Sequence, residues 1–353
     1  MASAAEVMKT VTKKIKGTSA KLASDYENCE RIPTGIFELD YAMGGGFPRG
    51  KISIIYGQES SNKTNVCLRT ARSDMMLGKD RMWVFMDIEN HFDPVWAKRL
   101  GINLEQLIVV KPDYAEQAVD LAEAFLMADD IHGIIIDSLA MLTPEAEASS
   151  TADRTQVGGN AKVVTALMRK MTRCLLMCLE EDRYPTILCI NQVRQKIGVM
   201  FGDPETQAGG NAVRFQSGLT LRLYGKDKIP KGSKIPYLKE TKCVIRKAKV
   251  PILNKNPEFD FVVLPYDIYQ IGESLEWTFL LAQLKDLGWM VQEGKKWKFD
   301  GEEFAKQDDV KPYIYEDLAY LEQVKTSIIK TRMIDLHGED AWIDYETPKA
   351  EKA

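Results

Sequence analysis

Histidine and paired cysteines are what this sequence has least of. Its 353 residues contain three histidines and six cysteines. No two cysteines form a C-x-x-C pair, which argues against a zinc site. Such cysteines usually pack as small apolar residues in a reducing compartment, which predicts a cytoplasmic protein. The six are Cys29, Cys67, Cys174, Cys178, Cys189 and Cys243.

Long apolar runs and excess positive charge are also missing. No segment approaches the roughly 20 apolar residues of a membrane helix, and the first residues lack the apolar part of a secretory signal. The formal net charge of −4 argues against a generally basic coat for nucleic acid. The charge is uneven, however. Residues 226–255 hold ten Lys or Arg against two acids, and residues 266–353 hold eleven against nineteen, which suggests different partners.

Short apolar runs alternate with longer helical patterns between residues 35 and 223. Continuous Val- and Ile-rich runs are typical of strands buried on both faces of a parallel sheet. The alternation predicts an α/β fold, with a mostly parallel central sheet and helices on both faces. A changed pattern after residue 256, an amphipathic helix and then a hairpin, predicts a small α+β domain. The expected strands are 51–56, 81–87, 106–110, 133–137, 186–191 and 219–223, and the expected helices are about 63–77, 94–100, 115–128 and 159–182.

The segment GQESSNKTN, residues 57–65, resembles the phosphate-binding loop G-x-x-x-x-G-K-[ST] with one departure. In such a loop, backbone N–H groups and a helix N-terminus surround the phosphates. Lys63 would contact the outer phosphates and Thr64 would bind Mg²⁺. Asn62 stands where the pattern has glycine. Because asparagine tolerates positive φ, we expect it to be accommodated, and expect Asn62→Gly to leave turnover unchanged or higher.

Two carboxylates follow other expected strands. Asp137 ends the run GIIID, where it would hold the Mg²⁺ shell, although it could instead cap the next segment. Glu89 lies just beyond the strand 81–87, where it could activate the attacking water. Taken alone, Glu89 would more often be a solvated loop acid. Two long polar stretches, 143–160 and 193–215, are expected to be functional loops.

Four blocks of the sequence resemble those of bacterial and phage RecA-type recombinases. They are TGIFELDYAMGGGFPRGKISIIYGQESSNKT, FMDIENHFDP, IIIDSLAMLTPEAE and INQVRQKIGVMFGDPETQAGGNAVRF, in the order that the family has them. The resemblance implies a RecA-like P-loop ATPase core at 32–265, an N-terminal oligomerisation segment at 1–31 and a small C-terminal domain at 266–353.

The resemblance also implies a function. It implies a DNA-stimulated ATPase that uses ATP and Mg²⁺, forms homo-oligomeric helical filaments on single-stranded DNA, and exchanges strands with homologous duplex DNA in recombination and repair. Single-strand-binding and loader proteins would accompany it, and no membrane is involved. Extra residues before the strand 186–191 and the lack of a very acidic tail favour a phage member.

Site residues carry over by position. Glu89 matches the catalytic glutamate, Gln192 the residue that senses the γ-phosphate, and Lys63 the phosphate lysine. Trp96 stands where tyrosine is usual, and an indole can still stack on the base. The ATP-binding positions are Gly57, Gln58, Glu59, Ser60, Ser61, Asn62, Lys63, Thr64, Asn65, Asp93, Trp96, Asp137, Lys247 and Lys249, with Thr64 and Asp137 at the metal.

Lys247 and Lys249 are expected on one face of a strand, from which they would reach the ATP site of the next subunit. The first DNA loop corresponds to residues 145–158 and the second to 193–215, where Ile197 would be the wedge between bases. Lys162 replaces the usual arginine. The implied DNA-binding residues are Lys162, Arg169, Arg194, Ile197, Gly209, Gly210, Asn211 and Arg214.

Two other functions stay open at this point. One is a filament scaffold that binds ATP and DNA but hydrolyses ATP weakly because of Asn62. The other is a helicase on the same core, against which the sequence lacks a zinc finger and a large primase-binding domain.

Overall fold

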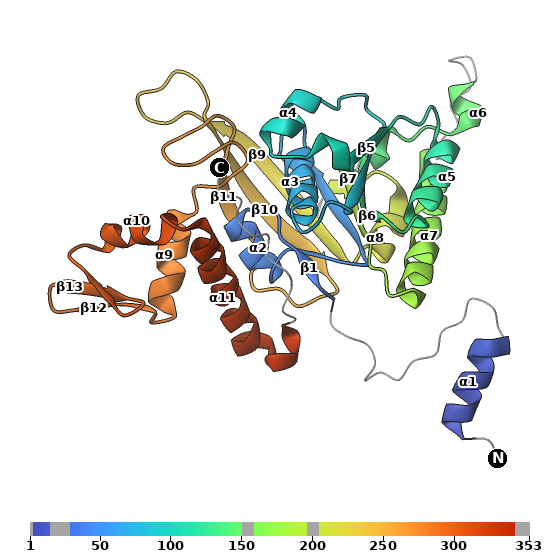
Figure 1. The fold of residues 1–353 in the computed structure, drawn as a ribbon. Coiled ribbons are helices and arrows are strands. Elements are labelled where there is room, and N and C mark those ends of the chain that lie inside the picture. The colour runs from blue at the N-terminus through green and yellow to red at the C-terminus, as the bar shows by residue number, and fades with distance from the viewer. Residues whose placement is uncertain (1–2, 15–28, 150–158, 196–204, 343–353) are drawn as a thin grey trace.

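The computed structural model describes residues 3–14, 29–149, 159–195 and 205–342. Figure 1 shows a large central sheet with helices packed against it and a smaller sheet with its own helices to one side. The large sheet has nine strands, in the order β11-β10-β9-β3-β7-β6-β4-β5, with β8 paired to β7. The strands are β3 (Ile52–Gly57), β4 (Met82–Asp87), β5 (Leu107–Val110), β6 (Ile131–Asp137), β7 (Thr186–Gln195), β8 (Glu205–Gln207), β9 (Leu219–Lys228), β10 (Leu238–Ala248) and β11 (Glu258–Val262).

The pairing within this sheet is mostly parallel. The neighbours from β9 through β3, β7, β6 and β4 to β5 all run parallel. β10 pairs antiparallel with β9 and β11, and β8 pairs antiparallel with β7. The predicted α/β fold with a mostly parallel sheet is therefore confirmed.

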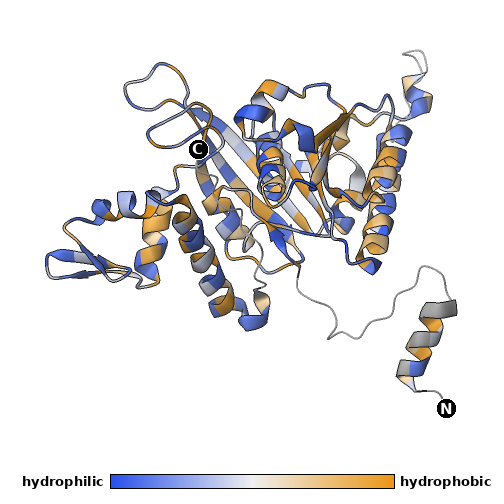
Figure 2. Cartoon of the chain, viewed as in Figure 1, coloured by the Kyte–Doolittle hydropathy of each residue, from blue (hydrophilic) through white to orange (hydrophobic). Residues whose placement is uncertain are grey.

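Helices cover both faces of the sheet because successive strand residues point to opposite sides. Ile55 and Phe85 belong to the apolar cluster under α2, α3 and α4, whereas Ile54 and Val84 belong to the cluster under α5 and α7. Figure 2 shows hydrophobic residues along these strands and polar residues on the outer faces of the helices. These helices are α2 (Phe37–Met43), α3 (Lys63–Met75), α4 (Pro94–Arg99), α5 (Ala115–Leu126) and α7 (Gly159–Glu180).

The expected strands and helices of this region are all present, with ends that differ by a few residues. Asp93 caps α4 as expected, because its side chain accepts hydrogen bonds from the backbone of Val95 and Trp96. The largest differences are at the ends of β7 and β9. The last five residues of β9 are exposed and pair only with β10, so the sequence carries no burial pattern there.

The C-terminal region contains a three-stranded antiparallel sheet, which confirms the predicted α+β character. The expected helix and hairpin are α9 and β12–β13, whereas α10 and α11 were not predicted. The ring of Phe279 makes edge contacts with Phe37 and Tyr41 of α2, with centroids 5.5 and 5.2 Å apart. The region therefore packs on the core through α2. Its elements are α9 (Trp277–Asp286), β12 (Met290–Glu293), β13 (Lys296–Phe299), β14 (Glu302–Phe304), α10 (Val310–Tyr315) and α11 (Leu318–His337).

The remaining elements are short. Within the described ranges, no helix has both the length and the apolar character needed to cross a membrane. The short elements are α1 (Ala4–Lys14), β1 (Arg31–Ile32), β2 (Phe47–Pro48), α6 (Glu145–Ala148), α8 (Gly210–Gln216) and the 3₁₀ turns Leu104–Gln106, Leu139–Met141, Gln307–Asp309 and Glu339–Ala341.

Candidate functional site

The loop between β3 and α3 has the backbone of a phosphate-binding loop. β3 ends at Gly57, and a Cβ there would lie 2.3 Å from the Ser61 hydroxyl and 2.5 Å from the Leu223 carbonyl. Only glycine fits at that position. Asn62 has φ of 67°, the left-handed conformation that asparagine tolerates. The position therefore needs positive φ, and Asn62 supplies it in place of glycine.

Lys63 begins α3 and reaches back across the loop. Its ammonium donates to the Gln58 carbonyl at 2.6 Å. Burial lowers the pKa of Lys63, and the carboxylates of Asp137 and Glu89 oppose that shift. Gln58, Glu59 and Ser60 are exposed, whereas the buried Ser61 donates to the same carbonyl at 2.7 Å. The lysine thus spans an open loop, where a phosphate could replace the carbonyl as its partner.

Thr64 and Asp137 are in direct contact. The Thr64 hydroxyl donates to Asp137 Oδ2 at 2.7 Å, although the two residues come from α3 and the end of β6. Burial raises the pKa of Asp137 to about 6, and the bond from Thr64 opposes the shift. Among the described residues, no cluster of three His, Cys, Asp or Glu could hold a metal alone. One hydroxyl and one carboxylate fit Mg²⁺, which usually completes its shell with phosphates and water.

Glu89 lies between the phosphate loop and the start of the second long loop. Its Oε1 accepts from the Ser138 hydroxyl at 2.5 Å and from Gln192 Nε2 at 3.0 Å. Its backbone N–H and that of Ile88 donate to the Asp137 carbonyl. The structure thus brings together Glu89, Asp137 and Gln192, which the sequence selected from three separate strands. Ser138 was not predicted as a site residue, although its place directly after Asp137 was a usable signal.

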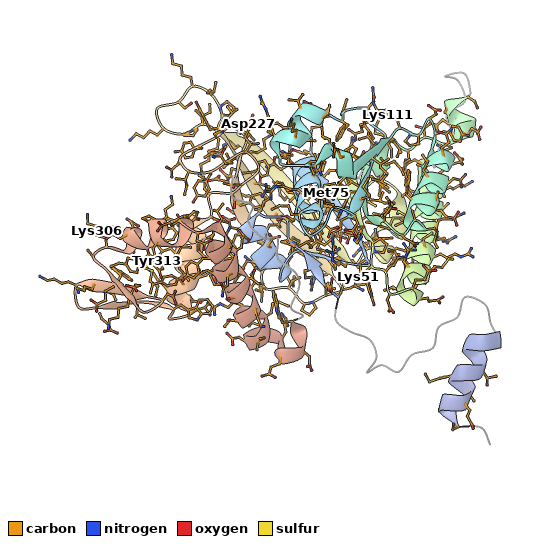
Figure 3. The ribbon with its side chains drawn as sticks, in the orientation of Figure 1. Lys51, Met75, Lys111, Asp227, Lys306 and Tyr313 are labelled. Carbon is orange, nitrogen blue, oxygen red and sulfur yellow. The ribbon has the colours of Figure 1, made fainter. Side chains whose placement is uncertain are left out.

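Asp87 is a second residue of the site that was not predicted from the sequence. It is buried at the end of β4, and its two oxygens accept from the backbone N–H of His91 and Phe92 at 2.9 and 3.2 Å. Lys111, labelled in Figure 3, places its ammonium 3.7 Å from the same carboxylate. Asp87 therefore fixes the turn that carries Glu89.

Trp96 lies beside the phosphate-loop helix. Its indole N–H donates to Asn65 Oδ1 at 2.8 Å, so α4 and α3 meet at this bond. The Asp93 carboxylate is exposed and accepts from the backbone of Val95 and Trp96. An indole held there could form one wall of a base-binding site.

The described residues that the resemblance assigns to DNA lie on α7, β7 and α8 or directly before α8. Lys162 and Arg169 are exposed on α7, Arg194 is exposed on β7, and Arg214 is exposed on α8. Gly209 has φ of 88° and packs so closely that an added Cβ would lie 2.5 Å from Val164 of α7.

Three further DNA-binding predictions concern the second loop. Gly210 and Asn211 are the first residues of α8. Ile197 lies outside the described residues, as do 150–158 of the first loop. The described part of the second loop adjoins the nucleotide site, since Gln192 pairs with Gly57 and Val193 pairs with Gln207.

Lys247 and Lys249 lie away from their own phosphate loop. Lys247 pairs with Thr220, which pairs with Ile54, three residues before the loop begins at Gly57. The two lysines were predicted on one face of a strand, but β10 ends at Ala248, so Lys249 lies one residue beyond the strand. Both ammonium groups nevertheless donate to the Phe215 carbonyl, at 3.1 and 3.2 Å. Burial lowers the pKa of Lys247, and the nearby Lys249 lowers it further.

Comparisons with known proteins identify the family of the chain. The sequence profile described as RecA N-terminal domain matches residues 3–265. Protein RecA of Acholeplasma laidlawii is 35% identical over 317 residues, which cover 89% of this chain and 91% of that protein. Protein RecA of Ruminococcus albus is 35% identical over 85% of this chain and 72% of its own length. Protein RecA of Halalkalibacterium halodurans is 33% identical over 341 residues, which cover 96% of this chain and 92% of that protein. The chain therefore belongs to the RecA family of DNA-dependent ATPases.

Proposed function

We propose that this RecA-family recombinase drives DNA strand exchange and repair through the constellation around Glu89. The family is one of ATP- and DNA-binding, filament-forming recombinases. The observation that carries the assignment of roles is the 3.0 Å hydrogen bond between Gln192 and Glu89. It joins the first residues of a DNA loop to a carboxylate beside Lys63, Thr64 and Asp137.

The roles follow from the chemistry of each group. Thr64 and Asp137 would hold Mg²⁺, which would neutralise the charge that develops on the phosphates. Lys63 would leave the Gln58 carbonyl for the outer phosphates. Glu89 would orient a water molecule and take its proton as the water oxygen bonds to the γ-phosphorus and ADP leaves. Asp93 and Trp96 would hold the adenine.

The proposed DNA contacts divide into two kinds. The exposed cations Lys162, Arg169, Arg194 and Arg214 would neutralise DNA phosphates. Gly209, Gly210 and Asn211 would offer backbone N–H groups, and Ile197 would separate bases. Single-stranded DNA would bind first and homologous duplex would follow.

The proposed assembly is a filament in which Lys247 and Lys249 enter the ATP site of a neighbouring subunit. Their distance from their own phosphate loop supports this arrangement. We also propose the division into an N-terminal oligomerisation segment at 1–31, a core at 32–265 and a C-terminal domain at 266–353. The separate apolar cluster of α9, α10 and α11 supports the last of these.

The two alternatives are not favoured. The scaffold with weak hydrolysis depended on a defective loop, and Asn62 adopts the backbone that the loop needs. The helicase has no observation in its favour, and the named relatives are all RecA proteins.

The test of the site is Lys63→Ala. The loop then loses its only side-chain cation, so ATP turnover and strand exchange should both be abolished. Turnover is measured as phosphate release with single-stranded DNA, and exchange with a labelled homologous duplex. Lys79→Ala, at an exposed lysine after α3, is the control and should retain both activities. Near-normal turnover in Lys63→Ala would overturn the site.

A further inference from the structure

Four residues form a continuous chain of hydrogen bonds from Trp96 to Thr241 of β10, the strand next to the edge of the sheet. Trp96 Nε1 donates to Asn65 Oδ1 at 2.8 Å, and Asn65 Nδ2 donates to Asn62 Oδ1 at 2.9 Å. Asn62 Nδ2 then donates to Thr241 Oγ1 at 2.6 Å. The Thr241 hydroxyl donates to the Lys239 carbonyl at 3.3 Å, which ends the chain. The chain links α4, α3, the phosphate loop and β10.

The direction of every bond in this chain is fixed by its first member. An indole N–H can only donate, so Asn65 must turn its oxygen towards Trp96 and its NH₂ towards Asn62. Asn62 must therefore present its oxygen to Asn65 and its NH₂ to Thr241. Asn62 and Thr241 are buried, and a buried amide that loses its partner costs the full desolvation of that group. The chain thus has one stable arrangement.

Two of its members, Asn62 and Trp96, stand at positions where the sequence departs from the RecA-type pattern. Glycine at position 62 has no amide to accept from Asn65 or to donate to Thr241. Tyrosine at position 96 has no ring N–H to orient Asn65. The two departures, Asn62 and Trp96, are therefore connected through Asn65 in one hydrogen-bond network.

We propose that Asn62 and Asn65 are positioning residues that join the base wall to the phosphate loop, so that base and phosphates are recognised by one unit. The inference rests on the proposed function, in which Trp96 stacks on the adenine. A base that stacks on Trp96 would then fix the orientation of Asn65 and Asn62, and with them the left-handed turn before Lys63. Breaking the chain should weaken ATP binding more than it slows the chemical step, because Lys63, Glu89 and Asp137 keep their own contacts.

The test is a double-mutant cycle of Asn62→Gly and Trp96→Tyr in the full chain, because residues in one hydrogen-bond network are not additive. KM and kcat for ATP are measured with saturating single-stranded DNA, and Kd is measured with a non-hydrolysable ATP analogue. Each single variant should raise KM and Kd roughly five-fold or more, with kcat changed much less. The double variant should bind ATP no more weakly than the weaker-binding single variant, since one substitution already breaks the hydrogen-bond chain.

Matched variants keep the result interpretable. Thr241→Val removes only the last hydroxyl of the hydrogen-bond chain and should also raise KM for ATP. It replaces Asn62→Gly in the cycle if Asn62→Gly folds poorly. Asn103→Ala removes an exposed amide that bonds Gln106 instead, and its effect should multiply with that of Trp96→Tyr. Asn65→Ala should also change the fluorescence emission of Trp96. That emission is obtained by subtracting the spectrum of Trp96→Tyr from the spectrum of the chain that keeps Trp96.

The outcomes separate the two proposals. A wild-type chain that does not bind the ATP analogue would overturn the proposed function. If the wild-type chain binds the analogue, two results would overturn only the coupling. One is that the effects of Asn62→Gly and Trp96→Tyr multiply, and the other is that both variants leave KM unchanged. A non-multiplicative cycle together with the shifted Trp96 emission establishes it.

Discussion

Arg222 of β9 and Glu205 of β8 form an ion pair with two hydrogen bonds. Arg222 Nε lies 2.9 Å from Glu205 Oε2, and Nη2 lies 2.8 Å from Oε1. The guanidinium is almost fully buried and lies over the ring of Tyr224, 4.0 Å from its centroid. Glu205 is the first described residue after 196–204, and Arg222 pairs with Tyr56, which precedes the phosphate loop. The pair thus ties the second DNA loop to β9, the neighbour of the strand that leads into the phosphate loop.

Removing the acid of this pair should cost more stability than removing the base. Glu205→Ala leaves a buried cation without its carboxylate, which should lower the free energy of unfolding by about 2–4 kcal/mol. Arg222→Met should cost less, because the partly exposed Glu205 can turn to water. Urea unfolding measures both. Glu303→Gln, in an exposed pair with Lys296, is the control and should leave the midpoint unchanged. Equal effects of Glu205→Ala and the control would show that the pair does not stabilise the fold.

Glu89→Gln should separate ATP binding from ATP hydrolysis. The amide oxygen can still accept from Ser138 and Gln192, but it cannot take a proton from water. Hydrolysis should fall roughly 100-fold or more, while ATP and single-stranded DNA still bind. Phosphate release at saturating DNA measures the change, with Glu105→Gln as the control at an exposed glutamate. Unchanged hydrolysis would make Glu89 a loop acid and nothing more.

Gln192→Ala should uncouple DNA affinity from the bound nucleotide. Gln192 bonds Glu89, and the next residue begins the pairing of β7 with β8, so the γ-phosphate can reach the DNA loop through one side chain. A contact of this kind is worth about 5–150-fold in affinity. Single-stranded DNA affinity is compared with ATP analogue and with ADP at one salt concentration, since phosphate contacts are salt-dependent.

In Gln192→Ala the ratio between the two nucleotides should approach one, while ATP binding without DNA is retained. Gln117→Ala, at the start of α5, is the control and should keep the wild-type ratio. A wild-type ratio in Gln192→Ala would move the coupling elsewhere, to Lys247 and Lys249 first.

Glu38→Gln should flatten part of the dependence of stability on pH. The Ser274 hydroxyl donates to Glu38 at 2.7 Å, and burial raises the pKa of Glu38 from 4.5 to about 7. The folded chain therefore holds this proton more tightly than the unfolded chain. Its contribution is fully present below pH 4.5 and is lost as the pH rises through about 7, up to about 3 kcal/mol.

The measurement is the free energy of unfolding in urea from pH 4.5 to 8, compared between wild type and Glu38→Gln. The glutamine keeps an oxygen for Ser274 but carries no titrating proton, so the difference between the two curves should grow as the pH rises. Parallel curves would mean that Glu38 titrates at its ordinary pKa.

Much of the site could be predicted because its members are marked locally. Asp137 and Glu89 each follow an apolar strand, and the carboxyl ends of parallel strands meet at one edge of a sheet. Lys63 and Thr64 follow from the loop pattern alone. The bond from Asn62 to Thr241 could not be predicted, since it joins residues 179 positions apart through the register of β10.

The fold shows the same division between local and distant signals. β3 and β6 were evident because they are buried on both faces. The end of β10 at Ala248, one residue before Lys249, is marked by no local pattern. α11 was missed although Leu321, Val324 and Ile328, buried at helical spacing, carried a usable signal.

Under the proposed assembly, the place of Lys247 and Lys249 gives a row of these subunits a direction. The strand position of Lys247 lies three residues, about 10 Å along the strand direction, before its own phosphate loop, so under the proposed assembly each subunit completes a neighbour and never itself. One terminal subunit then always has an uncompleted site. A pair of subunits carries a single complete site, whereas a long row approaches one per subunit. ATP turnover per chain should therefore rise with the length of the assembly, so that the specific activity reports the degree of polymerisation.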